Sequence, residues 1–307
     1  MFWQACALLF FLGDSFPSAA TVKVRRAKRA MVDFGRQPRA KWDVDASRGR
    51  CISVHNSINE ATVERALTEV LAYYQEMVPC LCFQQVSQSA CASDTAGCME
   101  FQGEYGKRGC FGRTRIGRGG EGTHVVYVSA ECPVFWKSKR TILHEMGHTL
   151  GFLHTQSRSD RDSYIRVNYQ NVQSGMEKQF EKRGRGFTDY GFPYDYESYM
   201  HSRPEQMSKN GQPTMTALQA GVSRIGREDD RMSVTDAALL TCAYCGQCGS
   251  GGGNAGGGGG GGTTPRFTTR PSTFPGRWTT SGGWGLARPG GRGQWRAPWR
   301  PRPWRRG

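Results

Sequence analysis

Apolar residues recur at helical spacing in two segments of the chain. Between residues 59 and 77 they are Val63, Ala66, Leu67, Val70, Leu71 and Tyr74, with Glu60 near the start. This pattern predicts an amphipathic helix that packs on a core. A second helix is predicted over residues 138–150, with Ser138 as its N-cap and Gly151 as the residue that ends it.

Two short runs are rich in aromatic and β-branched residues, which is typical of strands. They are CLCFQQV, residues 80–86, which follows Pro79, and THVVYVS, residues 123–129. Glycine-rich turns and three cysteines lie between them, so we expect a twisted sheet whose loops are tied by disulfides. Together with the helices, this predicts an α+β domain over residues 30–249.

The two ends of the chain differ from this domain in composition and charge. Residues 250–307 are a Gly-rich linker, a Thr/Pro stretch and an Arg/Trp-rich end, and this composition predicts a disordered tail. The tail carries ten arginines and no acidic residue, and residues 1–29 carry five basic residues and Asp14. The formal net charge of +15 therefore leaves only about +1 for the domain.

The first 20 residues contain an apolar run that is too short to span a bilayer and is followed by small residues. This predicts a secretory signal and an extracellular protein without a transmembrane segment. Residues 21–29 form a short propeptide or processing segment with a dibasic-rich site, although a solvated charge run is the alternative. For an exported chain, the basic tail favours an extracellular polyanion as partner rather than a specific nucleic acid, and a tail without a dedicated partner is equally open.

Cysteine usage agrees with export. Apart from Cys6 in the predicted signal, ten cysteines remain, which allows up to five disulfides. The cluster CAYCGQC also has the residue types of a zinc site. No second Cys/His cluster of matching spacing lies nearby, so the sequence favours disulfides there.

The stretch TILHEMGHTLGFLHTQSRSDRD, residues 141–162, carries the candidate chemistry. His144 and His148 are four residues apart and project from one face of the predicted helix, close enough to bind one ion. Gly151 can end the helix and turn the chain so that His154 returns to the same ion. Three neutral imidazoles are the ligands of a catalytic zinc, so we expect one zinc ion here.

Glu145 follows the first of these ligands, where it can reach a zinc-activated water and act as the general base of peptide hydrolysis. A core helix with merely hydrogen-bonded histidines is the alternative, and any single histidine would favour it. The full spacing His-Glu-x-x-His-x-x-Gly-x-x-His reverses that preference.

This spacing is similar to that of the metzincin proteases, which carry a methionine turn further on, and Met200 is the candidate here. The segments GFLHTQSRSDRD and PYDYESYMH resemble the astacin family, as do CLCF, GCFGRTRIGRGG, AEC and SVTDAALLTCAYC, from about Trp42 to Cys248. The matching residues are Arg158, Asp160, Arg161, Asp162, Ser198, Met200 and His201.

The resemblance implies a two-lobed zinc endopeptidase that acts on protein or peptide substrates. Its upper lobe would hold a twisted, mostly antiparallel-edged sheet and two long helices, and its irregular lower lobe would hold the Met turn. The resemblance also implies that Cys110 pairs with Cys132, and that Cys80 pairs with a cysteine between Cys242 and Cys248, either Cys245 or Cys248.

Three positions depart from the family pattern or complicate it. Thr155 stands where the family has a glutamate that receives the mature amino terminus, and Ser202 stands where it has a tyrosine that stabilises the oxyanion. Asp14, in FLGD, resembles the family's inhibitory propeptide aspartate, but we interpret it as a chance match within the export signal. Ser202 keeps open the alternative of a weakened or inactive zinc-binding protein that attaches to matrix.

Overall fold

The computed structural model describes residues 30–248, apart from residues 107–108, 121, 133 and 228. The predicted signal with Asp14, the processing segment over residues 21–29, and the tail over residues 250–307 all lie outside the described residues, so those predictions remain as they stand.

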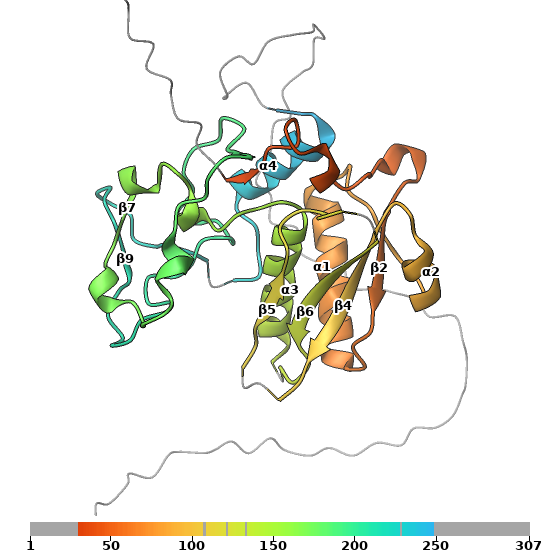
Figure 1. The fold of residues 1–307 in the computed structure, drawn as a ribbon, viewed down its shortest axis with the longest axis horizontal. Coiled ribbons are helices and arrows are strands. Elements are labelled where there is room, and N and C mark those ends of the chain that lie inside the picture. The colour runs from red at the N-terminus through yellow and green to blue at the C-terminus, as the bar shows by residue number, and fades with distance from the viewer. Residues whose placement is uncertain (1–29, 107–108, 121, 133, 228, 249–307) are drawn as a thin grey trace, which may run out of the picture. The chain divides into compact units, whose positions relative to one another are not determined.

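A five-stranded sheet with the order β3-β2-β4-β6-β5 forms the largest element of the fold (Figure 1). Its strands are β2 (Ile52–Asn56), β3 (Phe83–Gln85), β4 (Cys98–Glu104), β5 (Gly112–Thr114) and β6 (Thr123–Ser129). Strands β3, β2, β4 and β6 are parallel, and only the edge strand β5 is antiparallel to its neighbour. The expectation of mostly antiparallel edges is therefore wrong for the β3 edge, because long connections return the chain in the same direction between successive strands.

Two long helices pack against each other, and the second packs on β5 and β6. Helix α1 (Ala61–Met77) buries all six apolar residues of the predicted stripe, which confirms that prediction. Helix α3 (Phe135–Thr149) begins three residues earlier than expected, with Val134 as its N-cap. Ser138 is not the cap, because it lies in the first turn of the helix. Its hydroxyl is buried and donates to the carbonyl of Cys132.

The remaining elements are short. Helix α2 spans Gln88–Ser93, and α4 spans Val234–Cys245. Two further sheets have two strands each, β1 (Met31–Val32) with β8 (Phe187–Thr188), and β7 (Ile165–Val167) with β9 (Met215–Ala217). In the described part of the chain, 3-10 helices connect these elements at Pro38–Ala40, Ala46–Arg48, Thr155–Ser157, Arg161–Ser163, Tyr169–Asn171 and Glu177–Phe180.

The buried apolar residues form two separate clusters. The main core joins the large sheet to α1, α3 and α4. The second core is small and lies among the irregular segments after residue 155, and its buried members are Ile165, Val172, Phe180, Tyr194, Met215 and Ile225. The main core thus belongs to the regular part of the α+β fold, and the second core belongs to its irregular part.

Ten cysteines form five disulfides. The pairs are Cys51–Cys82, Cys80–Cys245, Cys91–Cys98, Cys110–Cys132 and Cys242–Cys248. The cysteines of CAYCGQC are thus all disulfide-bonded and do not form a zinc cluster. Among the described residues, no helix has the length and apolar character needed to cross a membrane.

Candidate metal and catalytic centre

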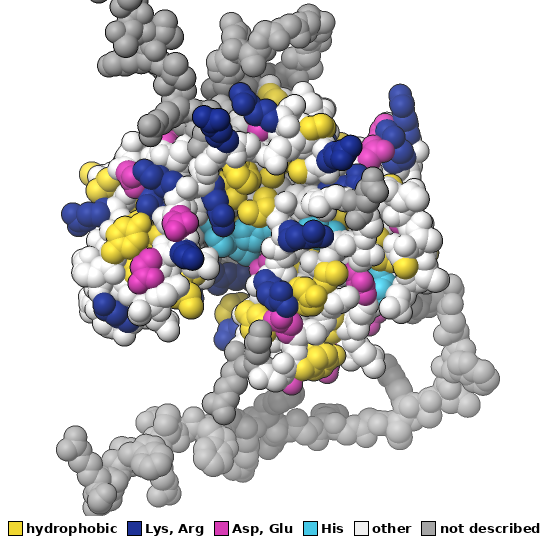
Figure 2. Space-filling model, in the orientation of Figure 1, with side chains coloured by type: hydrophobic (Ala, Val, Ile, Leu, Met, Phe, Trp, Pro, Cys, Tyr) yellow, Lys and Arg dark blue, Asp and Glu magenta, His cyan; other side chains and the backbone are white. Residues whose placement is uncertain are grey.

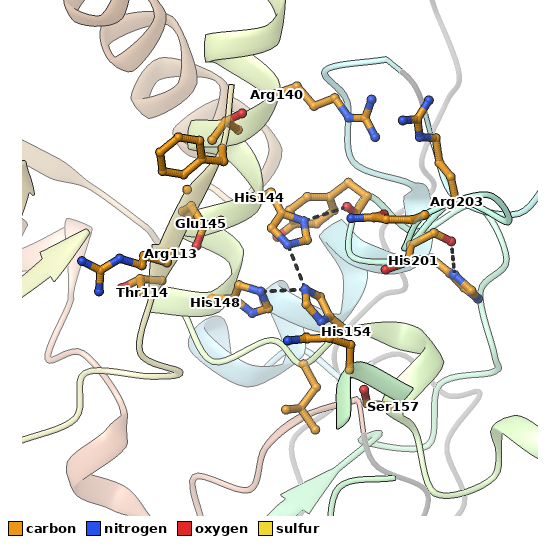
Figure 3. A pocket seen from close by; sticks show the side chains of 18 of the residues that line it. Arg113, Thr114, Arg140, His144, Glu145, His148, His154, Ser157, His201 and Arg203 are labelled. Carbon is orange, nitrogen blue, oxygen red and sulfur yellow. Dashed lines mark hydrogen bonds between the residues drawn. The ribbon is translucent and has the colours of Figure 1, made fainter. Parts of the chain in front are cut away.

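Three imidazoles converge at the C-terminal part of α3 (Figure 3). His144 and His148 project from the same face of the helix because they are four residues apart. The Nε2 atom of His154 lies 3.0 Å from the Nε2 atoms of both. The three residues predicted as ligands are therefore brought together around one point.

A Schellman motif at the end of α3 delivers His154. The N–H of Gly151 donates to the carbonyl of His148, and the N–H of Phe152 donates to the carbonyl of Gly147. Gly151 has a φ of +107°, and a Cβ at this position would also lie 3.0 Å from the ring of Phe34. A glycine is required here for the backbone turn that the sequence predicted.

Backbone carbonyls orient two of the three rings. The Nδ1 atom of His144 lies 3.2 Å from the carbonyl oxygen of Tyr199, and that of His148 lies 3.0 Å from the carbonyl oxygen of Phe152. Each Nδ1 therefore carries the proton, which leaves the Nε2 lone pair directed at the shared point. Burial lowers the pKa of His144 to about 3 and that of His148 to about 4, and burial also lowers the pKa of His154.

This donor set fits zinc. Three neutral imidazole nitrogens that converge from two chain segments match the ligand type and number of a catalytic zinc site. The separation of 3.0 Å between ligand atoms is close to the ~3.3 Å expected for two nitrogens at about 2.05 Å from a tetrahedral ion. Among the described residues, no other group of His, Cys, Asp or Glu side chains is arranged to bind a metal.

Glu145 lies beside the histidines, between α3 and β5 (Figure 3). It is 5% exposed, and its Oε2 atom accepts no hydrogen bond from the residues that the structure describes. Burial raises the pKa of Glu145 to about 8. A buried carboxylate oxygen without a partner is costly, and such groups are typical of sites that bind a ligand or perform chemistry.

The side chain of Glu145 fits because residue 112 on β5 is a glycine. A Cβ at Gly112 would lie 2.4 Å from Cγ of Glu145 and 2.9 Å from its Oε1. Gly112 belongs to the quoted segment GCFGRTRIGRGG, but the sequence alone did not indicate this contact.

Met200 lies in a tight turn that packs against α3. The N–H of His201 donates to the carbonyl of Ser198 across the turn, and Met200 is fully buried. A Cβ at Gly147 would lie 2.6 Å from Sδ of Met200 and 2.5 Å from the hydroxyl of Tyr199. Gly147, between the two helical histidines, thus allows the turn to approach the helix closely.

Thr155 and Ser202 are both buried near this turn. The N–H of Thr155 donates to the carbonyl of Met200. The hydroxyl of Ser202 accepts a hydrogen bond of 2.6 Å from Nε2 of Gln156, and the N–H of Ser202 donates to Oε1 of the same side chain. The Gln156 side chain therefore binds Ser202 at both its hydroxyl and its backbone N–H.

The charged residues that follow His154 form ion pairs and hydrogen bonds within the fold. Arg158 is 2% exposed and pairs with Asp160 and Asp189, and its guanidinium also donates to the carbonyl of Pro193. Arg161 pairs with Asp162 and donates to the carbonyls of Gln156 and Phe180. These residues tie the irregular segments together away from the histidines.

The histidines lie at the floor of an open cleft of about 970 Å³ (Figure 2). The cleft is lined by both parts of the fold, including β5 and α3 on one side and residues near Ser157 and Ser202 on the other. Its basic residues are Arg113, Lys137, Arg140, Lys178, Arg183 and Arg203, and Trp136 on α3 is half exposed at its wall. The cleft is large enough to take an extended polypeptide.

Some residues of the site were missed at the level of sequence. They are Tyr74, Gln156, Tyr199 and Asp236, whose contacts join segments that are far apart in the chain. The Ser-x-x-Asp spacing at Ser233 and Asp236 indicates a helix start, but it does not reveal what else the aspartate contacts.

Known proteins resemble this chain in sequence and in fold. The zinc metalloproteinase nas-15 of Caenorhabditis elegans is 38% identical over 142 residues, which are 46% of this chain and 24% of that protein. Protein SpAN of Strongylocentrotus purpuratus is 34% identical over 171 residues, 55% of this chain and 26% of that protein. The chain thus spans about a quarter of the length of these curated relatives.

Among solved structures, high choriolytic enzyme 1, a hatching enzyme zinc-protease from the medaka fish Oryzias latipes, has a similar fold. The TM-score is 0.56 at 23% sequence identity, and the match covers 67% of this chain and 94% of that one. The family model for the astacin peptidases matches residues 38–245, which is more than half of the chain. The α+β fold, the histidine triad and this match together show that the chain belongs to the astacin family.

Proposed function

We propose that this protein is a secreted zinc metalloendopeptidase that hydrolyses peptide bonds of protein or peptide substrates. One observation carries the proposal. A buried carboxylate oxygen, Oε2 of Glu145, which has no hydrogen-bond partner among the described residues, lies beside three converging neutral imidazoles at the floor of an open cleft. Membership of a zinc-dependent protease family supports the same assignment.

In this proposal His144, His148 and His154 hold one zinc ion. Bound zinc would supply a lowered pKa for an attacking water and polarisation of the scissile carbonyl. Glu145 takes the proton of the attacking water and passes it to the leaving nitrogen, so that the amine departs uncharged. Its burial helps, because a carboxylate with few hydrogen bonds binds a proton more readily.

The substrate is expected to bind as an extended strand along β5. Gly112, Arg113 and Thr114 line the cleft at the edge of the large sheet, and β5 pairs with β6 on its other side only. An extended peptide can add to such an edge through its backbone, which recognises polypeptides with little dependence on sequence.

Export is part of the proposal. Five disulfides support an oxidising compartment, and the first 20 residues have the pattern of a secretory signal. The basic tail would bind an extracellular polyanion after export.

A second candidate function is a zinc-binding protein with little or no catalysis. The contact between Gln156 and Ser202 favours it, because the Ser202 hydroxyl is held by Gln156 and is too short to replace a phenol. Loss of one oxyanion donor lowers the rate by about 100-fold or more in other hydrolases, which slows an enzyme without abolishing its reaction.

The substitution Glu145→Gln separates the two candidates. Casein digestion should fall by about 100-fold to 10,000-fold while the bound zinc is retained, because the general base is lost and the ligands are not. Glu64→Gln, an exposed position on α1, is the matched control and should digest casein like the wild type. Digestion by the wild type should stop when a chelator is added.

The assay should use the full chain and the chain cut near Arg29, so that latency is measured at the same time. A wild type that binds zinc but digests no casein in either form would establish the non-catalytic alternative. Full activity of Glu145→Gln would overturn the proposed role of Glu145.

A further inference from the structure

Asp236 is a buried carboxylate at the start of α4, far in sequence from the histidine motif. It is 3% exposed. Part of its role is local, because it forms a capping box with Ser233, in which each side chain accepts from the other's backbone N–H. A cap alone does not explain the remaining hydrogen bonds of this carboxylate.

The other bonds reach into the turn that carries Met200. Oδ1 of Asp236 accepts from the hydroxyl of Ser198 at 2.7 Å, and Oδ2 accepts from the N–H of Tyr199 at 3.0 Å. The Ser198 hydroxyl in turn accepts from the N–H of Met200. The Asp236 carboxylate thereby fixes the backbone of the turn that packs against α3.

Tyr199 connects this carboxylate to the metal centre. Its N–H is held by Asp236, and its carbonyl oxygen lies 3.2 Å from Nδ1 of His144. Its hydroxyl contacts that of Tyr74, which donates to the carbonyl of Leu143, the residue before His144. Tyr199 is therefore held at its N–H, its carbonyl and its hydroxyl, and two of these contacts end at His144 or its neighbour.

The helix that carries Asp236 is itself well anchored. Helix α4 belongs to the main core, its Cys245 is bonded to Cys80, and the hydroxyl of Tyr244 donates to the carbonyl of Leu150 at the end of α3. A carboxylate on such a helix can hold the turn in one place relative to α3.

We propose that Asp236 is a positioning residue for the metal centre, which fixes the Tyr199 peptide so that its carbonyl orients the His144 ring toward the shared ion. Metal-binding histidines commonly donate their second ring nitrogen to a group that fixes their orientation, and loss of such a group typically costs about 10-fold to 100-fold in metal affinity. Here the orienting group is a peptide carbonyl, and the carboxylate acts through it. This inference rests on the proposed zinc site.

The test measures zinc affinity of the full chain by competition with a chromophoric chelator, together with the visible spectrum of the Co²⁺-loaded protein. Asp236→Ala should weaken zinc binding by about 10-fold to 100-fold and change the Co²⁺ spectrum. Asp236→Asn should recover most of the affinity, because its amide oxygen can accept from both backbone N–H groups while its nitrogen donates to Ser198.

Ser233→Ala is the matched control, since it removes the cap from the same helix, together with the hydrogen bond from the Ser233 hydroxyl to Asp195, but leaves the bonds between Asp236 and the turn. It should lower the melting temperature by about 2–4 °C and leave the zinc affinity and the Co²⁺ spectrum unchanged. If Asp236→Ala does not fold, Ser198→Ala tests the same contact, and it should weaken zinc binding where Ser233→Ala does not.

The outcomes are distinguishable. Wild-type affinity and spectrum in Asp236→Ala, or in Ser198→Ala if the first variant does not fold, would overturn the positioning role while the zinc site itself stands. A wild-type chain that binds no zinc would instead overturn the proposed function.

Discussion

The two parts of the fold are held together by different means. The main-core region, residues 30–154 with α4 and the segment after it as far as Cys248, contains the large sheet, two long helices and the five disulfides. The cysteine-free region, residues 155–232, has a small apolar core, one short strand pair of its own, β7 with β9, and several 3-10 turns. Its strand β8 pairs with β1 of the main-core region. In the cysteine-free region, buried arginines join the segments, whereas disulfides and regular packing do so in the main-core region.

The groups of the candidate site divide along the same line. His144, His148 and Glu145 lie on α3, in the main-core region, and helix geometry alone brings them together. The carbonyl that orients His144 and the buried Met200 come from the cysteine-free region. The difference teaches that the site depends on how firmly the less regular region is held against α3.

Arg158→Ala should have the largest effect on stability. The Arg158 side chain is buried, and its removal takes away the cation that pairs with Asp160 and Asp189. Loss of one partner of a buried pair typically costs 3–5 kcal/mol, so we expect the free energy of unfolding in urea to fall by about 4 kcal/mol.

Arg166→Ala is the matched control, because Arg166 is an exposed arginine on β7 of the same region. It should change stability by less than about 0.5 kcal/mol. Equal effects of the two substitutions would show that the buried arginine does not hold this region together.

Gly147→Ala tests the junction between the regions and should give an intermediate effect. Helix propensity alone would favour alanine by up to about 1 kcal/mol. The new Cβ would lie 2.5 Å from the Tyr199 hydroxyl and 2.6 Å from Sδ of Met200, so the turn must move away from α3. Overpacking of this kind should lower the free energy of unfolding by about 3 kcal/mol and weaken zinc binding.

Gly184→Ala serves as control, since a Cβ there meets no atom within 4 Å. Unchanged stability in Gly147→Ala would mean that the turn adapts to the helix, and the dependence of the site on close contact between the regions would then be wrong.

The same division explains what the sequence could predict. The stripe of α1, the strand at residues 123–129 and the spacing of His144 and His148 are local patterns of side chains, and the structure has them where they were expected. The positive φ of Gly151 also follows from residue type and position. These features depend on backbone geometry within a few residues.

Contacts between distant segments could not be predicted in this way. The sequence around Gly112 does not show that Glu145 fills the space beside this glycine. Nor does the sequence around Gly147 show that Met200 packs against it. The start of α3 was misplaced because Ser138 has the residue type of a cap but finds an acceptor at Cys132 inside the fold. Likewise, Asp236 reads as a helix cap, and its contact with Tyr199 appears only when the chain is folded.

The smallest effect is expected at the edge of the cysteine-free region, where Asp162 forms an exposed ion pair. Burial alone would raise the pKa of Asp162, but hydrogen bonds from Lys182 and Arg161 outweigh it and lower the pKa below the usual 3.8. A lowered folded pKa means that the contribution to stability is present above the unfolded pKa and is lost as the pH falls through the folded pKa. Asp162 is 58% exposed, so solvent screens the pair.

Asp162→Asn should therefore lower the free energy of unfolding at pH 7 by less than about 1 kcal/mol, and this difference from the wild type should vanish once the pH is below the folded pKa. Urea unfolding of both proteins across this pH range gives the comparison, with the exposed Glu205→Gln as control. Added salt should reduce the difference at pH 7, because exposed charges are screened. A loss as large as that of Arg158→Ala would show that exposed pairs, and not the buried arginine, hold this region together.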